Sequence, residues 1–313
     1  MTEPVSPTEE TRRTAGILAV SLTTVVWGMA PLILKQMQMP VLTFAAYRLW
    51  AGVLIFAAMF AVTGRRLTWV TLRTCALGGV IFTADVACSF LAFRLTSVAD
   101  ATIIGALAPI CIMIGAGRWF GERVGRRELV FVGISLGGVA LVAIGSAGTP
   151  AFDVWGDLFA VASVFTWTAY WLVSKRARAS VGALEYMASV ILVAAVLMTL
   201  LALVSGEGLS PPSRAMDWLW IWVVALGAGA IGHVLLAWSH RHVEAWLGSL
   251  ITQCMPVVSS VAAWVLLGES LTPLTIVGGL IVLAATAAIL VRSRARGADD
   301  NTFEAPEMPT PAG

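Results

Sequence analysis

Charged side chains are scarce in this 313-residue sequence, where Asp, Glu, Lys and Arg together make up only 12% of the chain. A water-soluble domain carries about 25% charged residues, whereas 58% of this chain is hydrophobic. Most of its surface therefore faces something other than water, which excludes an ordinary soluble enzyme. A net charge of +2 also lacks the basic excess typical of nucleic-acid binding. The composition predicts a polytopic membrane protein.

Catalytic and metal-binding motifs are absent as well. The sequence contains no G-x-x-x-x-G-K-[ST] phosphate loop, no H-E-x-x-H and no G-x-S-x-G. The four cysteines, Cys75, Cys88, Cys111 and Cys254, are scattered through apolar segments and fit reduced hydrophobic side chains better than disulfides or a metal site. We therefore expect no enzyme activity, no cofactor and no metal.

Long apolar runs, in contrast, fill nearly the whole chain. A helix needs about 20 apolar residues to cross the hydrocarbon core of a bilayer, and ten runs approach or exceed that length. The breaks between them are rich in Gly and Pro, as expected of turns. We predict an all-α integral membrane protein with about ten transmembrane helices, near residues 16–34, 42–62, 75–93, 98–119, 129–144, 158–173, 187–204, 218–238, 247–267 and 274–291.

The distribution of Lys and Arg predicts the orientation, because loops rich in these residues stay in the cytoplasm. With the N-terminus inside, the inner segments hold 16 of the 20 basic residues. The outer connections hold only Lys35, Arg94 and Arg214, and Arg48 lies within a span. Both termini are therefore expected in the cytoplasm, with the chain in a bacterial-type inner (plasma) membrane.

An internal repeat is the most informative feature of the chain. Matching residues recur 140 positions apart in the first and sixth spans and 147 apart in the fourth and ninth. The matched pairs are Trp27 and Trp167, Lys35 and Lys175, Pro109 and Pro256, Gly121 and Gly268, and Glu122 and Glu269. Each repeat holds five spans, an odd number, so the second copy is predicted to enter the membrane inverted. Inverted repeats are typical of secondary transporters.

This repeat predicts the domain organisation. Residues 1–15 are predicted to form a cytoplasmic N-terminal tail and residues 16–147 the first repeat. Residues 155–293 are predicted to form the second, inverted repeat and residues 294–313 a disordered cytoplasmic C-terminal tail.

The repeated motifs resemble those of the drug/metabolite transporter superfamily, of the EamA type. The resemblance rests on Trp27-Gly28, the run from Pro109 to Gly121-Glu122-Arg123, Trp167-Thr168-Ala169-Tyr170, and Pro256-Val257-Val258 leading to Leu266-Leu267-Gly268-Glu269-Ser270. It implies ten helices, a central cavity lined mainly by spans 1 to 4 and 6 to 9, peripheral spans 5 and 10, and alternating access. Thr168 departs from the first repeat, which has Gly after its Trp.

The function expected from this resemblance is secondary active transport of a small amphipathic metabolite, such as an amino acid or a drug-like compound. Export is the main prediction, coupled to protons or running as exchange. Proton-coupled import is the alternative, and a channel or a membrane-embedded partner subunit is an alternative of another class. The expected partners are the substrate and the lipid bilayer, with no nucleic acid, and the chain is expected to be a monomer or a homodimer.

Ionisable side chains inside a span are functional candidates because burying them in a membrane is costly. Asp85 lies midway along the third span, and desolvation favours the protonated form of a carboxyl group, so Asp85 is the candidate proton carrier. Arg48 lies at a similar depth, and both residues are candidates for substrate contact in the cavity. The two could form an ion pair, either one that a substrate or a proton breaks or a static salt bridge. His233 and Gln253 are candidates for substrate contact or for helix packing.

Aromatic residues complete the predicted cavity. The candidates are Trp27, Tyr47, Trp167, Tyr170 and Trp246, whose rings suit an amphipathic organic molecule.

Two prolines interrupt spans at matched positions of the repeats. Pro109 and Pro256 free backbone carbonyls within the fourth and ninth spans, which favours either gating or a fixed kink.

Overall fold

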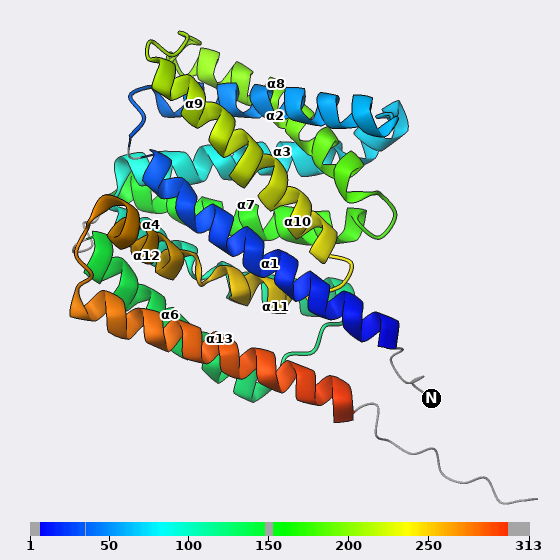
Figure 1. The fold of residues 1–313 in the computed structure, drawn as a ribbon, viewed down its shortest axis with the longest axis vertical. Helices are drawn as coiled ribbons and strands as arrows, with labels where there is room; N and C mark the ends of the chain where they lie inside the picture. Colours follow the sequence, from blue (N-terminus) through cyan, green and yellow to red (C-terminus); the bar gives the residue numbers. More distant parts are fainter. Residues whose placement is uncertain (1–6, 35, 148–152, 300–313) are drawn as a thin grey trace, which may run out of the picture.

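The computed structural model describes residues 7–34, 36–147 and 153–299. Over these ranges the chain forms helices and no strand, and ten helices are long and apolar enough to cross a membrane. The all-α fold and the number of spans predicted from the sequence are confirmed. In Figure 1 the helices lie side by side as a bundle, and α1 begins at the end where α13 finishes.

Seven spans are continuous helices. They are α1 (Pro7–Leu34), α2 (Val41–Thr63), α3 (Trp69–Leu95), α6 (Arg126–Ala147), α7 (Val154–Ala177), α8 (Ala183–Val204) and α13 (Pro273–Asp299). Helix α1 begins well before the apolar run at residue 16, because Pro7 fits a first helical turn and no following residue breaks the helix. Helix α13 likewise runs past residue 294, where a disordered tail was predicted, and residues 300–313 lie outside the described ranges.

Three spans are interrupted. The fourth comprises α4 (Val98–Gly105) and α5 (Ala108–Phe120), and the ninth comprises α11 (Ala245–Thr252) and α12 (Met255–Leu267). The eighth runs from α9 (Ala215–Val224) through a π-helix, η1 (Ala225–Gly232), into α10 (His233–Ser239). Helices α5 and α12 end alike, each on a left-handed glycine, Gly121 with φ 68° and Gly268 with φ 70°. These two glycines are one of the pairs matched by the repeat.

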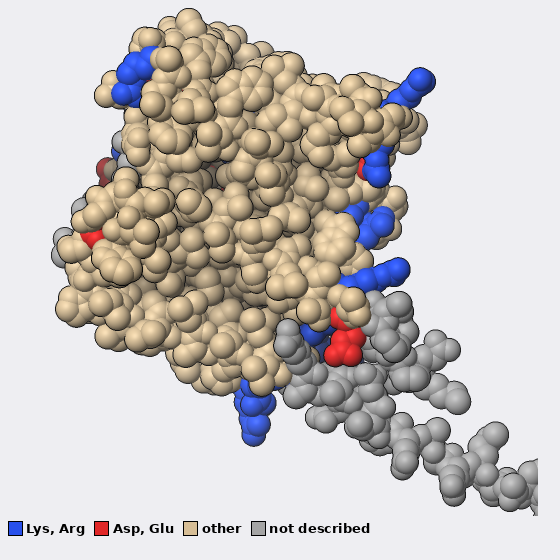
Figure 2. Space-filling view, viewed as in Figure 1, with Lys and Arg blue, Asp and Glu red and all other residues tan. Residues whose placement is uncertain are grey.

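The surface of the bundle suits a bilayer. In Figure 2 charged side chains lie towards the two ends of the molecule and the broad middle carries almost none, with Lys and Arg mainly at the end where α1 begins. Large apolar side chains point outward from the middle of the spans, among them Leu54, Phe165, Leu200 and Leu280, each more than half exposed. This protein is a multi-pass membrane protein.

The fifth and tenth spans, α6 and α13, pack together at one edge of the bundle, opposite α2 and α8 (Figure 1). Their backbones meet at two glycines, since a Cβ added to Gly278 would lie 2.6 Å from the Gly138 carbonyl oxygen and one added to Gly138 would lie 2.9 Å from the Gly278 oxygen. Small residues allow such close approach between membrane helices.

Replacing Gly278 with alanine is expected to lower stability by about 1 to 3 kcal/mol, because the added methyl forces the two helices apart. Gly133→Ala on α6 is the matched control, since nothing lies within 4 Å of its added Cβ. There alanine is expected to be neutral or stabilising by up to about 1 kcal/mol. Thermal melting of the purified protein in detergent compares the two, and equal melting temperatures would contradict the close glycine contact.

Candidate functional site

Asp85 is buried in the middle of α3 and faces α7. Its side-chain Oδ1 accepts hydrogen bonds from Ser163 Oγ at 3.2 Å and from Thr166 Oγ1 at 3.4 Å. The residue is only 7% exposed. This carboxyl group is therefore held by two neutral hydroxyls, and among the described residues no cation contacts it. It could exchange a proton without breaking an ion pair.

Arg48 does not form the predicted ion pair with Asp85. Its guanidinium carbon lies 5.8 Å from the centre of the Phe90 ring, and the described part of the chain offers it no hydrogen bond and no carboxylate. The prediction was wrong because similar depth on neighbouring spans does not fix the direction in which each side chain points. Arg48 packs on the aromatic face of Phe90, while Asp85 turns towards α7.

Next to Asp85 lies an aromatic cluster that joins both repeats, consisting of Trp27, Phe82, Trp167, Tyr170 and His233. Trp27 of α1 and Trp167 of α7, matched in the repeat, meet edge to face with ring centres 5.6 Å apart. His233 packs on Trp27 at 4.7 Å and on Phe82 at 5.0 Å. Tyr170 contacts Trp167 at 5.5 Å. Four of these five residues were predicted; Phe82 was missed because a phenylalanine in an apolar span gives no functional signal.

The π-helix η1 forms one wall of this region. A π-turn leaves carbonyls that need other donors, and α1 supplies two of them. Trp27 Nε1 donates to the Ala228 carbonyl at 2.9 Å, and Thr23 Oγ1 donates to the Gly232 carbonyl at 3.0 Å. A Cβ on Gly232 would lie 2.5 Å from Trp27 Nε1, so this contact requires glycine. Trp27 is thus fixed against the irregular backbone of the eighth span.

Gln253 joins two of the three interrupted spans, the fourth and the ninth. Its Nε2 donates to the Ala106 carbonyl at 2.9 Å, between α4 and α5, and its Oε1 accepts from Ser135 Oγ at 2.9 Å. Gln253 therefore makes interhelical hydrogen bonds, one of the two roles considered for it. Pro109 and Pro256 lie in the first turns of α5 and α12, directly after the two breaks.

Tyr47 lies away from the aromatic cluster. Its hydroxyl donates to the Leu209 carbonyl at 3.0 Å and its ring meets Trp218 edge to face at 5.4 Å. Tyr47 thus packs against the segment that follows α8. Trp246 is the second residue of α11 and belongs to a different group of contacts.

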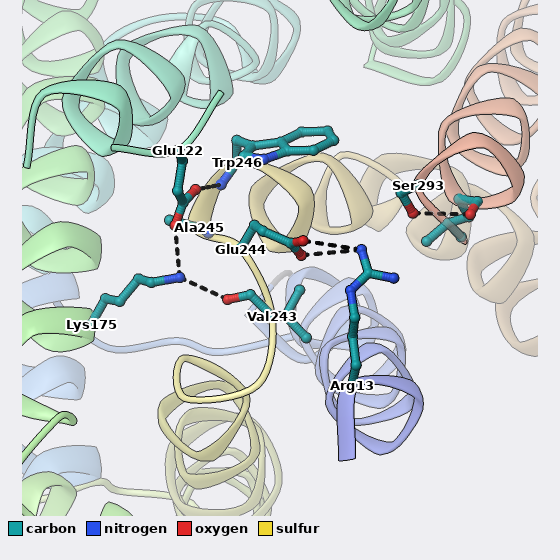
Figure 3. A network of polar contacts seen from close by, with 9 residues as sticks. Arg13, Glu122, Lys175, Val243, Glu244, Ala245, Trp246 and Ser293 are labelled. Atoms are coloured by element: carbon teal, nitrogen blue, oxygen red, sulfur yellow. Dashed lines mark hydrogen bonds and ion pairs between the residues drawn. The ribbon is translucent and has the colours of Figure 1, made fainter. Parts of the chain in front are cut away.

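Those contacts form a polar network, the α11 network, made by Glu122, Lys175, Val243, Ala245 and Trp246 (Figure 3). Glu122 Oε1 accepts from the Ala245 backbone N–H at 3.0 Å and lies 2.7 Å from Lys175 Nζ. Glu122 Oε2 accepts from the Trp246 N–H at 3.3 Å, and Lys175 Nζ donates to the Val243 carbonyl at 2.8 Å. The network joins α5, α7 and the start of α11, where a carboxylate is favoured by the helix dipole.

The α11 network lies at the end of the bundle where α1 begins. Beside it, Arg13 Nη2 of α1 lies 3.2 Å from Glu244 Oε1 (Figure 3). The side chains of Glu122 and Lys175 are 9% and 16% exposed, so their ion pair is well shielded from water. Lys35, the counterpart of Lys175 in the first repeat, lies outside the described residues. Among the residues that the structure describes, no group of three or more His, Cys, Asp or Glu is placed to hold a metal ion.

His240 lies just past α10, where Ser174 Oγ is 2.9 Å from its Nδ1. Burial holds the pKa of His240 well below its ordinary value, and the positive charges of Lys175 and Arg178 lower it further. The unfolded chain binds a proton at this histidine below about pH 6.5, whereas the folded chain does not. Acid therefore favours unfolding at this residue.

The expected loss of stability attributable to His240 is about 1.4 kcal/mol between about pH 7.5 and about pH 5.5. His240→Gln keeps a polar partner for Ser174 but removes the proton-binding group, so its melting temperature should fall less over that interval. Melting curves of both proteins in one detergent measure the difference. Parallel curves for the two proteins would show that His240 is protonated in the folded state as well.

Comparisons with known proteins agree with this architecture. A model of the EamA-like transporter family matches twice, at residues 14–144 and 154–291. A protein of Salmonella typhimurium named as a probable amino-acid metabolite efflux pump is 24% identical over 283 residues, which are 87% of this chain and 93% of that protein. A solved crystal structure without a functional name superposes with a TM-score of 0.78 at 20% identity, covering 90% of this chain and 99% of that one. Because the family model covers both halves, this chain belongs to the EamA-like transporter family.

Proposed function

We propose that this protein is a secondary active transporter that exports a small amphipathic metabolite across the bacterial inner membrane, with both termini in the cytoplasm. The observation that carries the proposal is the aromatic cluster, where Trp27 and Trp167 meet beside His233. In transporters built from inverted repeats, the substrate site lies between the repeats, which rock around it. A cluster that takes matched residues from both repeats suits such a site. The protein of Salmonella typhimurium named as a probable amino-acid metabolite efflux pump, similar along most of its length, supports export as the direction.

The substrate suggested by the site has an apolar or aromatic body with a polar group. Rings of Trp27, Trp167 and Tyr170 provide apolar contact, and Asp85 provides a carboxyl group for a proton or a cationic group. Proton coupling is assigned to Asp85. The α11 network is assigned to the cytoplasmic end, where it keeps α5, α7 and α11 together and closes the path to the cytoplasm. Pro109 and Pro256 then mark the positions where spans 4 and 9 bend as the two repeats rock.

Counterflow in liposomes tests this function. Vesicles containing the purified protein are loaded with one unlabelled amino acid from a panel, and uptake of the same labelled compound is followed with and without a pH gradient. Saturable counterflow that a pH gradient enhances is the expected result. A flux that does not saturate would indicate a channel. No flux for any compound in the panel would contradict amino-acid transport. Right-side-out cells that accumulate the compound would indicate import.

A further inference from the structure

We infer that Arg48 binds a carboxylate of the transported molecule, so the substrate class narrows to zwitterions and organic acids with an apolar body. This inference rests on the proposed transport function and adds the residue that selects the substrate. It separates metabolites with a free carboxylate from cationic drug-like compounds, both of which an aromatic cluster alone would accept.

The first argument is the missing counter-charge. Arg48 lies seven residues into α2, about 10 Å from the start of that helix at 1.5 Å per residue. Burying a guanidinium at the centre of a membrane helix costs about 2.5 to 3.5 kcal/mol, and arginines inside spans are normally paired. Among the described residues Arg48 has neither a hydrogen bond nor an ion pair, and its Nε is buried without a partner.

Two acidic residues that contact α2 or α3 already have partners. Asp85 accepts from Ser163 and Thr166 of α7. Glu207 lies at the start of α2, where its Oε2 accepts from the Leu42 N–H at 2.8 Å and its Oε1 lies 3.0 Å from Arg94. The protein thus builds a pair for the exposed Arg94 and leaves the shielded Arg48 without one. A bound anion would supply that counter-charge.

The second argument is the position of Arg48 next to the aromatic cluster. Phe90 lies under the guanidinium at 5.8 Å and itself stacks on Phe44 at 6.4 Å, which holds the charged group in place. Phe90 packs against the same hydrophobic cores as Trp167, and those cores contain Trp27, Phe82 and Tyr170 of the aromatic cluster. The His233 Nδ1 atom is also buried without a partner. Arg48, beside Phe90, and His233, within the cluster, therefore each have a buried nitrogen without a partner, and buried polar atoms without partners call for an explanation.

Together these contacts describe a site with two parts. A carboxylate would lie against the Arg48 guanidinium, which presents several N–H donors in a plane suited to carboxylate oxygens. The apolar body of the same molecule would extend past His233 onto Trp27 and Trp167. A compound with the same body but no negative charge would leave Arg48 unpaired and would bind less well.

The experiment compares L-phenylalanine with L-phenylalaninamide, which keeps the ring and the ammonium group but lacks the carboxylate. Each is tested as an inhibitor of counterflow of labelled L-phenylalanine in liposomes. In the wild-type protein the acid is expected to bind about tenfold more tightly than the amide or better, because the amide lacks the charged hydrogen bond to Arg48. Arg48→Gln should reduce that preference to near one by weakening binding of the acid alone, and Arg48→Lys should keep part of it.

Arg94→Gln is the matched control, because it removes an arginine that has a partner and lies 55% exposed at the end of α3. Its acid-to-amide preference should equal that of the wild type.

A preference that survives in Arg48→Gln, or a wild type that prefers the amide, would overturn the inference while counterflow itself persists. A wild type that shows no counterflow of L-phenylalanine or of any other amino acid in the panel would contradict the proposed amino-acid transport instead. Melting temperatures of the three variants show whether each is folded. If Arg48→Gln is not folded, the acid-to-amide preference of Arg48→Lys is used to test the inference instead.

Discussion

Asp85→Asn is expected to abolish proton-driven accumulation of substrate while leaving exchange of substrate across the membrane intact. The physical reason lies in the partners of Asp85, which among the described residues are two hydroxyl groups of α7 and no cation. Asparagine keeps the shape and an oxygen that can accept from Ser163 and Thr166, but it cannot take up or release a proton. Packing at the site is preserved, and only the coupling chemistry is removed.

The size of the effect follows from the driving force. With a pH gradient of about one unit, one coupled proton supplies about 1.4 kcal/mol, which supports an about tenfold concentration ratio of substrate. In liposomes under that gradient the wild type should approach this ratio, and Asp85→Asn should stay near one. Counterflow without a gradient should remain within about threefold of wild type.

Ser163→Ala is the control for a structural role, since it removes one of the two hydrogen bonds but leaves the carboxyl group. Accumulation driven by the gradient should persist in this variant, with an altered pH profile. If Asp85→Asn still accumulates substrate under a pH gradient, the proton carrier is another group. If it loses counterflow as well, Asp85 serves binding or folding rather than coupling.

The spans were predictable because the information for them is local. Apolar length and turn residues define where a helix can cross a bilayer, and all ten spans appear where such runs occur. Trp27 and Trp167 could also be identified from the sequence as candidates for the cavity, because each occupies the same position in its repeat. That their rings meet, with centres 5.6 Å apart, is known only from the packing.

The side-chain partners were much less predictable. Arg48 and Asp85 were placed at similar depth, yet α2 directs Arg48 to Phe90 and α3 directs Asp85 to α7. Depth follows from counting residues along a span, whereas the direction of a side chain around the helix axis depends on how the helices are rotated against each other. A single sequence contains no direct measure of that rotation.

The π-helix could not be predicted either, because no proline or polar residue marks residues 225–232. Its backbone is stabilised from outside, by Trp27 Nε1 and Thr23 Oγ1 of α1. Likewise the sequence marks Glu122 only as the repeat counterpart of Glu269, at the end of the fourth span. In the structure it accepts from the first amides of α11, 123 residues later in the chain. Such roles depend on tertiary contacts and are invisible in local patterns.

Disrupting the α11 network is expected to open the end of the bundle at which α1 begins. Lys175→Met removes the charge but keeps a long side chain, and Glu122→Gln removes the negative charge but keeps an oxygen. A hydrogen bond to a charged group contributes about 1.5 to 3 kcal/mol, so each change should shift the closed-to-open equilibrium by about 10- to 100-fold. Arg13→Gln is the control, because Arg13 and Glu244 are 26% and 38% exposed and an exposed pair contributes about 1 kcal/mol or less.

Hydrogen–deuterium exchange reports directly on this opening, since Glu122 accepts from the backbone amides of Ala245 and Trp246. Peptides covering the start of α11 should exchange at least about tenfold faster in Lys175→Met and Glu122→Gln and almost unchanged in Arg13→Gln. The charge-exchanged protein, Glu122→Lys with Lys175→Glu, should remain fast, because a lysine at position 122 cannot accept from two N–H groups. Full rescue by that exchange would mean that the ion pair alone closes this end and that capping of α11 contributes nothing. Unchanged exchange in both single variants would contradict any role of the network in closing this end.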